Sequence, residues 1–263
     1  MTRIQKKFCQ LKQNRKKAFI PYITLGDPDL ESTRRIILEL EKAGADIIEL
    51  GVPFSDPLAD GPVIQRATER ALRNGFTLKQ GLRFIGNLRK ETELPFLLFS
   101  YYNPLFAYGF KLLARDAKTS GIDGFLITDL SVEEAEEPIS MLRNLELDSI
   151  FLAAPTSTQE RIQKIAAFSS GFIYAISRTG VTGAQQSISD EVAPLVSRIR
   201  QHTDLPIAVG FGISNPEQVN EICLQADGAV VGSAIVRCIE ENLDNPRLAE
   251  RVGDYTRWLR GGI

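Results

Sequence analysis

The sequence predicts an α/β fold: a single (β/α)8 TIM barrel with an extra helix at its N-terminus. Short apolar runs, rich in β-branched and aromatic residues, recur eight times along the 263 residues, and each is about as long as a buried strand. Amphipathic segments with helical spacing lie between these runs, which indicates parallel strands joined by right-handed crossovers. At this chain length, eight such units close most naturally into one barrel.

The eight runs define the predicted strands. They span residues 18–24, 46–51, 95–101, 124–129, 149–154, 171–177, 206–212 and 228–233. An open doubly wound sheet is the alternative, but it would have a G-x-G-x-x-G turn after its first strand, and "ITLGDPD" is not such a turn. The stretches "AGADIIELG", "SGIDGFLITD" and "LQADGAVVG" enter their strands through a small residue and an Asp, and this echo favours the barrel. No linker interrupts the chain, so we expect one domain over residues 1–263.

The basic segment "QKKFCQLKQNRKK" precedes the first strand. Its spacing predicts an amphipathic helix, with Phe8 and Leu11 facing inward and the lysines in water. A nucleic-acid-binding arm is the alternative. The net charge of −2 creates no global field that would attract nucleic acid or a membrane, so we expect neither partner.

Capping signals place several of the crossover helices. Residues 29–44 have apolar side chains at helical spacing and end in a glycine. Ser131, with an acid three residues later, has the signature of a capping box and predicts that a helix begins there. Asn215 and Pro216 predict a cap followed by the first helical position, and another helix is expected to begin near Pro62.

The three cysteines include no C-x-x-C pair, and their odd number suits reduced thiols in a cytosol. No apolar run approaches the ~18 residues of a membrane-spanning helix. The N-terminus lacks the apolar core of a signal peptide. We therefore expect a soluble, cytoplasmic protein.

Several kinds of catalysis are excluded because the residues that they need are missing from the positions where this fold places its active site. Active sites of such barrels lie at the C-terminal ends of the strands. None of the eleven lysines is at a strand end, which excludes a Schiff-base aldolase. The single histidine, His202, ends a predicted helix on the opposite face, so it offers no metal cluster and activates no serine or cysteine. Acid–base chemistry by carboxylates, alone or together with tyrosine, remains.

The stretch "IELGVPFSDPLADGP" supplies two such carboxylates, Glu49 and Asp60. Glu49 alternates with Ile47, so both should face one side of the strand, where loss of solvation would raise the pKa of Glu49 and suit it to act as acid and base. Asp60 lies on a loop stiffened by prolines, and two acids in different environments take different protonation roles. The alternatives are a buried Glu49 paired with an arginine and an Asp60 that caps a helix.

Glycine-rich stretches after the last three strands predict an anion site. "SRTGVTGA", "VGFGIS" and "VVGSAIV" follow strands six, seven and eight, where many barrels bind phosphate on backbone amides and a helix N-terminus. Turns also favour glycine, so each stretch alone is a weak signal. Three in one quadrant favour a phosphate-bearing ligand.

In order and spacing, the chain resembles the α subunit of tryptophan synthase. The resemblance runs from "FIPYITLGDP" through "GADIIELGVPFSDPLADGPVIQ", "SYYNPLF", "GFLITDLSVEE", "YAISRTGVTGA" and "VGFGIS" to "GSAIV". It implies a lyase that cleaves indole-3-glycerol phosphate to indole and glyceraldehyde 3-phosphate, without a metal or Schiff base. It also implies a tryptophan synthase β subunit as partner in an α2β2 tetramer, with pyridoxal phosphate in that partner and no cofactor in this chain.

The resemblance also assigns residues. Glu49 would protonate the indole C3 and take the proton of the glycerol hydroxyl, while Asp60 would stabilise positive charge at the ring N–H. The phosphate cradle would be Gly183, Gly212, Gly232 and Ser233. The pocket walls would be Tyr22, Tyr101, Tyr174, Thr182 and Phe211. The loops 53–60 and 178–188 match those that close over substrate and touch the β subunit.

Two residues depart from the family pattern: Ser131 stands in place of a proline, and Tyr22 stands where phenylalanine is expected. Ser131 should loosen the start of a loop, and Tyr22 adds a hydroxyl near the indole pocket. A different class of function stays open as an alternative, in which the chain is a binding subunit that cleaves weakly and mainly activates a β partner. The presence of both carboxylates and of the glycines favours the enzyme.

Overall fold

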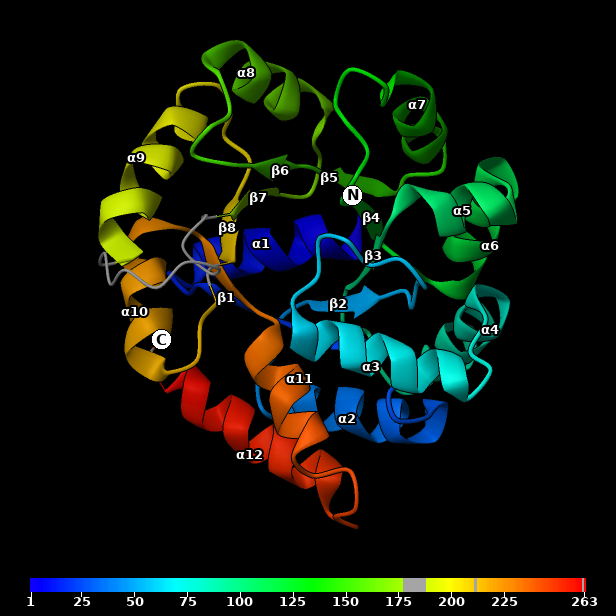
Figure 1. Cartoon of the computed structure of the whole chain (residues 1–263). Coiled ribbons are helices and arrows are strands. Elements are labelled where there is room, and N and C mark those ends of the chain that lie inside the picture. The colour runs from blue at the N-terminus through cyan, green and yellow to red at the C-terminus, as the bar shows by residue number, and fades with distance from the viewer. Residues whose placement is uncertain (177–187, 211, 262) are drawn as a thin grey trace.

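The computed structural model forms a ring of parallel strands surrounded by helices (Figure 1). The structure describes residues 1–176, 188–210, 212–261 and 263. The strands are β1 (Ala18–Thr24), β2 (Ile48–Gly51), β3 (Phe96–Ser100), β4 (Gly124–Ile127), β5 (Asp148–Ile150), β6 (Leu152–Ala153), β7 (Ile173–Ile176), β8 (Ile207–Gly210) and β9 (Gly228–Val231). The helices are α1 (Arg3–Gln13), α2 (Leu30–Lys42), α3 (Pro62–Arg73), α4 (Leu78–Leu88), α5 (Tyr102–Tyr108), α6 (Phe110–Ser120), α7 (Glu136–Asn144), α8 (Gln159–Phe168), α9 (Ile188–Arg200), α10 (Pro216–Gln225), α11 (Ser233–Glu240) and α12 (Leu248–Arg260).

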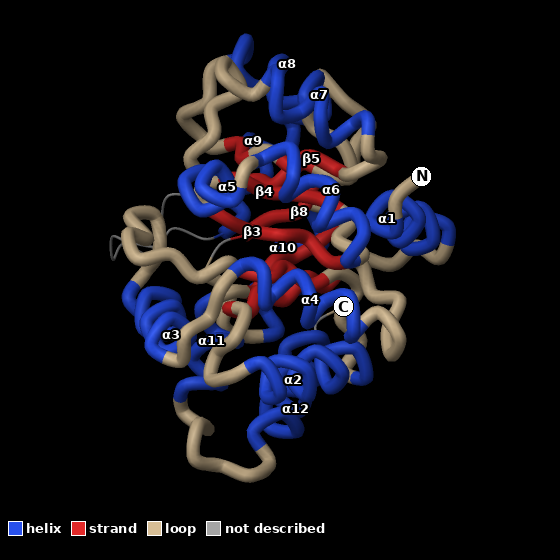
Figure 2. The backbone as a smooth tube through the Cα atoms, turned by 90° about the vertical axis from the view of Figure 1, so that its right-hand side faces the viewer, coloured by secondary structure: helices blue, strands red, loops and turns tan. Residues whose placement is uncertain are grey.

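The strand order closes the barrel that the sequence predicts. It runs β5-β4-β3-β2-β1-β9-β8-β7-β6, and the paired strands are parallel. The two ends of this order, β5 and β6, are separated along the chain by Phe151 alone, so they are two pieces of one predicted strand. The eight predicted strands are therefore all present, the fifth in two pieces. Figure 2 shows the strands at the centre with helices outside them.

Alternation along the strands separates the core into an interior and an outer layer. One set of side chains forms a cluster inside the ring: Ala18, Ile20, Ile47, Leu97, Leu126, Ile150, Phe172, Ala208 and Val230. The strand residues of opposite parity, such as Phe19 and Ile48, pack against the surrounding helices instead. The interior is thus filled with side chains, as in other barrels of this kind.

Helix α1 closes the N-terminal end of the barrel, where the strands begin. Ile4, Phe8 and Leu11 are buried and join the interior cluster, and the rings of Phe8 and Phe172 lie 5.6 Å apart. The predicted inward placement of Phe8 and Leu11 is confirmed. The narrow apolar face of α1 therefore covers the interior cluster at this end of the barrel, which explains why an extra helix precedes β1.

The aspartates that recur in the sequence just before the strands form the same hydrogen bonds at each of these positions. Oδ2 of Asp46 accepts the N–H of Phe19 at 3.0 Å, and Oδ2 of Asp123 accepts that of Phe96 at 2.9 Å. Asp227 does the same for Ile207 at 3.0 Å. Each of these aspartates also donates its own N–H to the carbonyl of the same partner. These hydrogen bonds tie the beginning of one strand to its neighbour, so these acids serve the sheet.

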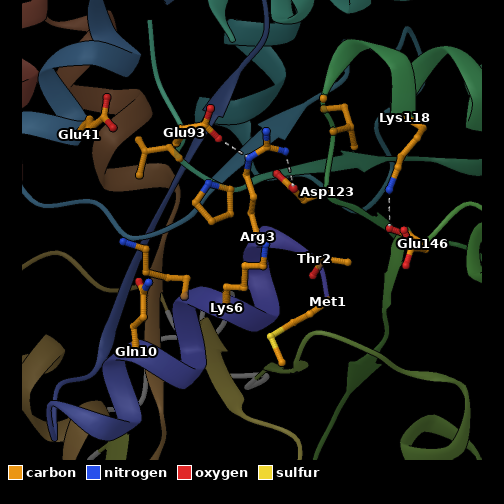
Figure 3. A pocket seen from close by; sticks show the side chains of 15 residues that line it. Met1, Thr2, Arg3, Lys6, Gln10, Glu41, Glu93, Lys118, Asp123 and Glu146 are labelled. Atoms are coloured by element: carbon orange, nitrogen blue, oxygen red, sulfur yellow. Dashed lines mark hydrogen bonds and ion pairs between the residues drawn. The ribbon is translucent and has the colours of Figure 1, made fainter. Parts of the chain in front are cut away.

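The N-terminal segment binds to two of these aspartates and to two further acids at the same end of the barrel. Arg3 lies between Glu93, at 2.7 Å, and Asp123, at 3.3 Å, and Lys7 lies 3.8 Å from Asp46. Nε2 of Gln5 donates to Asp148 at 2.6 Å. A polar cavity of about 580 Å³ opens beside these contacts (Figure 3). It lies at the N-terminal end of the barrel, opposite the predicted active site.

Two predicted helix starts are confirmed and one is wrong. Asn215 accepts the N–H of Gln218 and caps α10, which begins with Pro216, and α3 begins with Pro62. Helix α7 begins at Glu136 and not near Ser131. Ser131 forms a turn with Glu134 instead, because a helix from there would hold Pro138 in its interior, where it lacks the required N–H.

His202 follows the C-terminal end of α9, away from the strand ends that carry the predicted site. Its ring Nε2 lies 2.6 Å from the side-chain amide of Gln159. No helix in the described part of the chain combines the length and apolarity needed to cross a bilayer.

Arg15 adopts a left-handed backbone conformation, with φ 54°, just after the C-cap of α1. Its N–H donates to Lys12 and that of Lys16 donates to Leu11, a turn in which glycine avoids the Cβ strain. We predict that Arg15→Gly raises the free energy of unfolding by about 0.5–1 kcal/mol, measured by urea denaturation. Lys12→Gly, inside the helix, is the control and should lower it by about 1 kcal/mol. Equal losses in both variants would contradict this account.

Candidate active site

Glu49 and Tyr22 are neighbours near the C-terminal end of the barrel. They pair across β2 and β1, and they are only 1% and 6% exposed. Ile47 belongs to the interior cluster, and residues two apart on a strand share a face. Glu49 therefore points into the barrel above this cluster, as the alternation predicted.

No residue that the structure describes compensates the buried Glu49 carboxyl. Its Oε1 is buried without a hydrogen bond to any residue that the structure describes. Burial raises the pKa of Glu49 well above its usual 4.5, and no described neighbour offsets this effect by a charge or a hydrogen bond. The alternative of a structural Glu49 paired with an arginine therefore has no support within the described ranges. A buried, unpaired acid at a strand end is typical of a functional site.

Asp60 lies on the loop between β2 and α3, and its environment differs from that of Glu49. It is half-buried, and burial raises its pKa to about 6, although a hydrogen bond from Tyr101 offsets part of the shift. The N-cap of α3 is Gly61 without any side-chain cap, so Asp60 is not the capping residue. The two acids thus lie at the same end of the barrel, where Glu49 is shielded from water and Asp60 is partly exposed to it.

Direct contacts hold the Asp60 loop over the barrel end. The N–H of Asp60 donates to the carbonyl of Pro57 at 3.0 Å, which closes a turn. The hydroxyl of Tyr101 accepts the N–H of Ala59 at 2.9 Å, and Nε2 of Gln65 donates to the carbonyl of Asp60 at 2.8 Å. Tyr101 thus contacts both the loop backbone and the acid, and burial followed by the charge of Asp60 raises its own pKa to about 12.

Two tyrosines reach the barrel interior because glycines face them. A Cβ at position 51 would overlap the Tyr22 hydroxyl, and a Cβ at position 210 would overlap that of Tyr174. Burial raises the pKa of Tyr174 well above 10, and the nearby negative charge of Glu49 adds to the shift. The structure therefore brings the predicted residues Tyr22 and Tyr174 together beside Glu49.

Sequence reasoning did not single out Gly51, Gly210 or Phe99. The ring of Phe99 meets that of Tyr22 edge to face at 5.3 Å and so forms part of the same wall. The signal for the two glycines was present in "IELG" and "IAVG", where a glycine occupies an inward position at a strand end. Each glycine leaves room for an aromatic side chain from the adjacent strand.

The predicted anion site has free backbone donors in its described part. Gly232 is the N-cap of α11, Ser233 is its first residue, and this helix start has no side-chain cap. Gly212, with φ 56°, follows β8, which pairs with β9, so the two glycine stretches lie at adjacent strand ends. Uncapped N–H groups at a helix start are donors for an anion. The predicted residues Thr182, Gly183 and Phe211, and the loop 178–187, lie outside the described residues.

In the part of the chain that the structure describes, no group of three or more His, Cys, Asp or Glu side chains is arranged to hold a metal ion. The three cysteines are unpaired thiols: Cys9, Cys223 and Cys238.

Comparison with known proteins gives a consistent result over the whole chain. The model of the tryptophan synthase alpha chain family matches residues 8–255. The tryptophan synthase alpha chains of Solibacter usitatus and Geotalea uraniireducens are 52% and 51% identical to it over 263 residues, which cover 100% of this chain and 98% of each relative.

Solved structures agree with the sequence relatives. Tryptophan synthase subunit alpha from Legionella pneumophila superposes with a TM-score of 0.93 at 37% identity, covering 100% of this chain and 98% of that one. A chain of the tryptophan synthase α2β2 complex from the hyperthermophile Pyrococcus furiosus superposes with a TM-score of 0.86 at 39% identity, covering 93% and 98%.

We predict that Glu49→Gln stabilises the ligand-free protein, because an unpaired buried acid opposes folding when it ionises. The folded pKa is raised above the usual 4.5, so wild-type stability falls as pH rises above this value. The gain in the free energy of unfolding should be near zero at pH 4 and about 1–3 kcal/mol at pH 8, measured by urea denaturation. The exposed Glu69→Gln is the control. A loss of stability in Glu49→Gln at pH 8 would show that this carboxylate has a partner.

Proposed function

We propose that this chain, which belongs to the tryptophan synthase alpha chain family, is the α subunit lyase that cleaves indole-3-glycerol phosphate to indole and glyceraldehyde 3-phosphate. The observation that carries the proposal is the buried carboxyl of Glu49, which has no partner among the described residues and lies at the same barrel end as Asp60. A weakly cleaving subunit that only activates a partner would not need this destabilising group, so the enzyme is the better reading.

Glu49 carries the proton in this reaction. Its neutral carboxyl gives a proton to C3 of the indole ring, which places positive charge on the ring nitrogen. The resulting carboxylate takes the proton of the glycerol hydroxyl next to C3 as the carbon–carbon bond breaks. The bonding pair returns to the ring, so indole and the aldehyde form and Glu49 is again protonated. A raised pKa suits a group that must both give and take a proton.

Asp60 stabilises the positive charge that the ring acquires. Its carboxylate would accept a hydrogen bond from the ring N–H, and the hydrogen bond from Tyr101 would orient it. Since the protonated ring accepts the electron pair, the reaction needs neither a metal ion nor a lysine imine.

We assign the pocket and the phosphate cradle to the same end of the barrel. Tyr22, Tyr101 and Tyr174, with Thr182 and Phe211 of the family pattern, form the walls around the indole ring. Gly212, Gly232 and Ser233, with Gly183 of the family pattern, bind the phosphate on backbone N–H groups. The uncapped start of α11 supports this assignment.

The family relation also supports a partner. We propose an α2β2 tetramer with a tryptophan synthase β subunit that carries pyridoxal phosphate, while this chain, acting as one domain, binds no cofactor of its own. Leu58, at the tip of the Asp60 loop, is 94% exposed, which suits a loop that meets another chain. Unpaired thiols and a biosynthetic role are in keeping with a cytoplasmic enzyme.

Glu49→Gln is expected to abolish measurable cleavage while substrate still binds. Asp60→Asn should lower kcat by about 10²–10⁴-fold, the usual range for a positioned charged or proton-transferring group. The measurement is indole release from indole-3-glycerol phosphate, with and without a β subunit. Near-normal turnover by Glu49→Gln would refute the assignment of the proton shuttle.

The pH dependence of kcat/KM should report the Asp60 carboxyl. Because its pKa is about 6 and the ionised form is required, kcat/KM should fall as pH drops below 6, approaching tenfold per pH unit. Asp60→Asn should remove this limb, whereas the surface variant Asp254→Asn should retain it. An acid limb that persists unchanged in Asp60→Asn would assign it to another group.

A further inference from the structure

Two arginines and two acids form a connected set at the junction of β1, α3 and α11. We call this set the Arg70 network: Asp27, Arg66, Arg70 and Glu240. Nε and Nη2 of Arg70 donate to the two carboxylate oxygens of Asp27 at 2.8 and 2.9 Å. Nη1 of Arg70 donates to Oε1 of Glu240 at 2.7 Å. One guanidinium thus joins the loop after β1 to the end of α11.

Glu240 is bound from two successive turns of α3. Besides Arg70, Arg66 donates from Nε and Nη2 to its carboxylate oxygens at 2.8 and 2.7 Å. These hydrogen bonds, that of Arg66 first, lower the pKa of Glu240 to about 2, so the carboxylate stays charged over the working pH range. Planar, bidentate contacts of this kind fix direction as well as distance.

The same two helices also share an apolar seam. Val63 and Ala67 of α3 and Val236 of α11 are buried in one cluster with Tyr22 of β1. Figures 1 and 2 both show α3 and α11 side by side. The helices are therefore held together by apolar packing near their starts and by the Arg70 network further along.

Each of these helices begins at one end of the proposed substrate site. Asp60 lies two residues before α3, and Gly232 and Ser233 form the start of α11. Arg70 and Glu240 lie about two helical turns beyond these starts, roughly 10–12 Å at 1.5 Å per residue. A change of tilt at the network would therefore change the separation of the two helix starts.

We propose that Arg70 is a positioning residue which, through Glu240, fixes the separation between Asp60 and the phosphate-binding start of α11. This inference rests on the proposed function. The substrate carries its phosphate at one end and its indole N–H at the other, so a fixed separation lets phosphate binding hold the ring against Asp60. Binding energy at a remote group then contributes to turnover and not only to affinity.

A purely structural role for the network makes a different prediction. Asp27 is only 2% exposed and needs a cationic partner, so the loss of Arg70 would destabilise the fold whatever its effect on catalysis. A structural role would lower activity equally for substrates with and without a phosphate. The ratio between two such substrates therefore separates the two roles.

Glu240→Gln is the sharpest test, because it removes the charge and one of the two acceptor oxygens that tie α11 to the arginines and leaves the Arg70–Asp27 pair intact. Indole release is measured from indole-3-glycerol phosphate and from unphosphorylated indole-3-glycerol, in the presence of a β subunit. We expect the ratio of the two kcat/KM values to fall by about 10- to 100-fold, mainly through kcat for the phosphorylated substrate. The Kd for inorganic phosphate should change by less than about twofold, because the start of α11 remains.

The matched control is Glu91→Gln, which breaks another bidentate pair between elements, that of Arg34 with Glu91, and does not touch α3 or α11. Its ratio should equal that of the wild type. Arg70→Lys, which retains the charge but not the planar fork, should repeat the effect of Glu240→Gln, with folding checked by thermal denaturation.

The possible outcomes are distinct. If the wild type prefers the phosphorylated substrate and Glu240→Gln keeps the full ratio, the positioning role is refuted while the proposed function stands. If the wild type releases indole from neither substrate, the proposed function fails and the positioning role fails with it. A lowered ratio in Glu240→Gln and Arg70→Lys, with a normal ratio in Glu91→Gln, supports the role.

Discussion

The loss of solvation at the Glu49 carboxyl is the constraint on which the candidate site depends. The barrel interior beneath it is filled with apolar side chains, and α1 closes the far end with Ile4, Phe8 and Leu11. Because no polar group within the described interior hydrogen-bonds Oε1, the neutral acid is favoured. The contacts that hold α1 against the strand entrances thus also matter for the candidate site, because they help to keep water out of the interior beneath Glu49.

Buried acids at the two ends of the barrel have opposite roles, and their partners distinguish them. Asp46 is also buried, which raises its pKa, but it accepts the N–H of Phe19 and lies near Lys7. It therefore serves the sheet at the N-terminal end, where barrels of this kind place residues for stability. Glu49, at the other end, has neither kind of partner among the described residues. Burial alone does not mark a functional acid, but burial without a partner at a strand end does.

The sequence predicted features that depend on local spacing and missed those that depend on distant pairs. Strand alternation placed Ile47 and Glu49 on one face, and capping chemistry located α10. The same reasoning failed at Ser131, because Pro138, seven residues later, decides where α7 begins. The fit of Tyr22 against Gly51 and the contact of Arg70 with Glu240, 170 residues apart, need the closed barrel before they become visible.

The proposed reaction needs its two acids in opposite protonation states, and the fold supplies this difference through solvation. Glu49 is shielded from water and has no partner among the described residues, which favours the neutral acid that the proposed reaction needs first. Asp60 is half-exposed and receives a hydrogen bond from Tyr101, so it stays a carboxylate above about pH 6 and, in the proposed reaction, would face the developing positive charge. If the two environments were exchanged, Glu49 would be ionised and Asp60 protonated, and neither acid would be in the protonation state that the proposed reaction needs. For this reason one acid belongs on a buried strand and the other on a stiff loop above it.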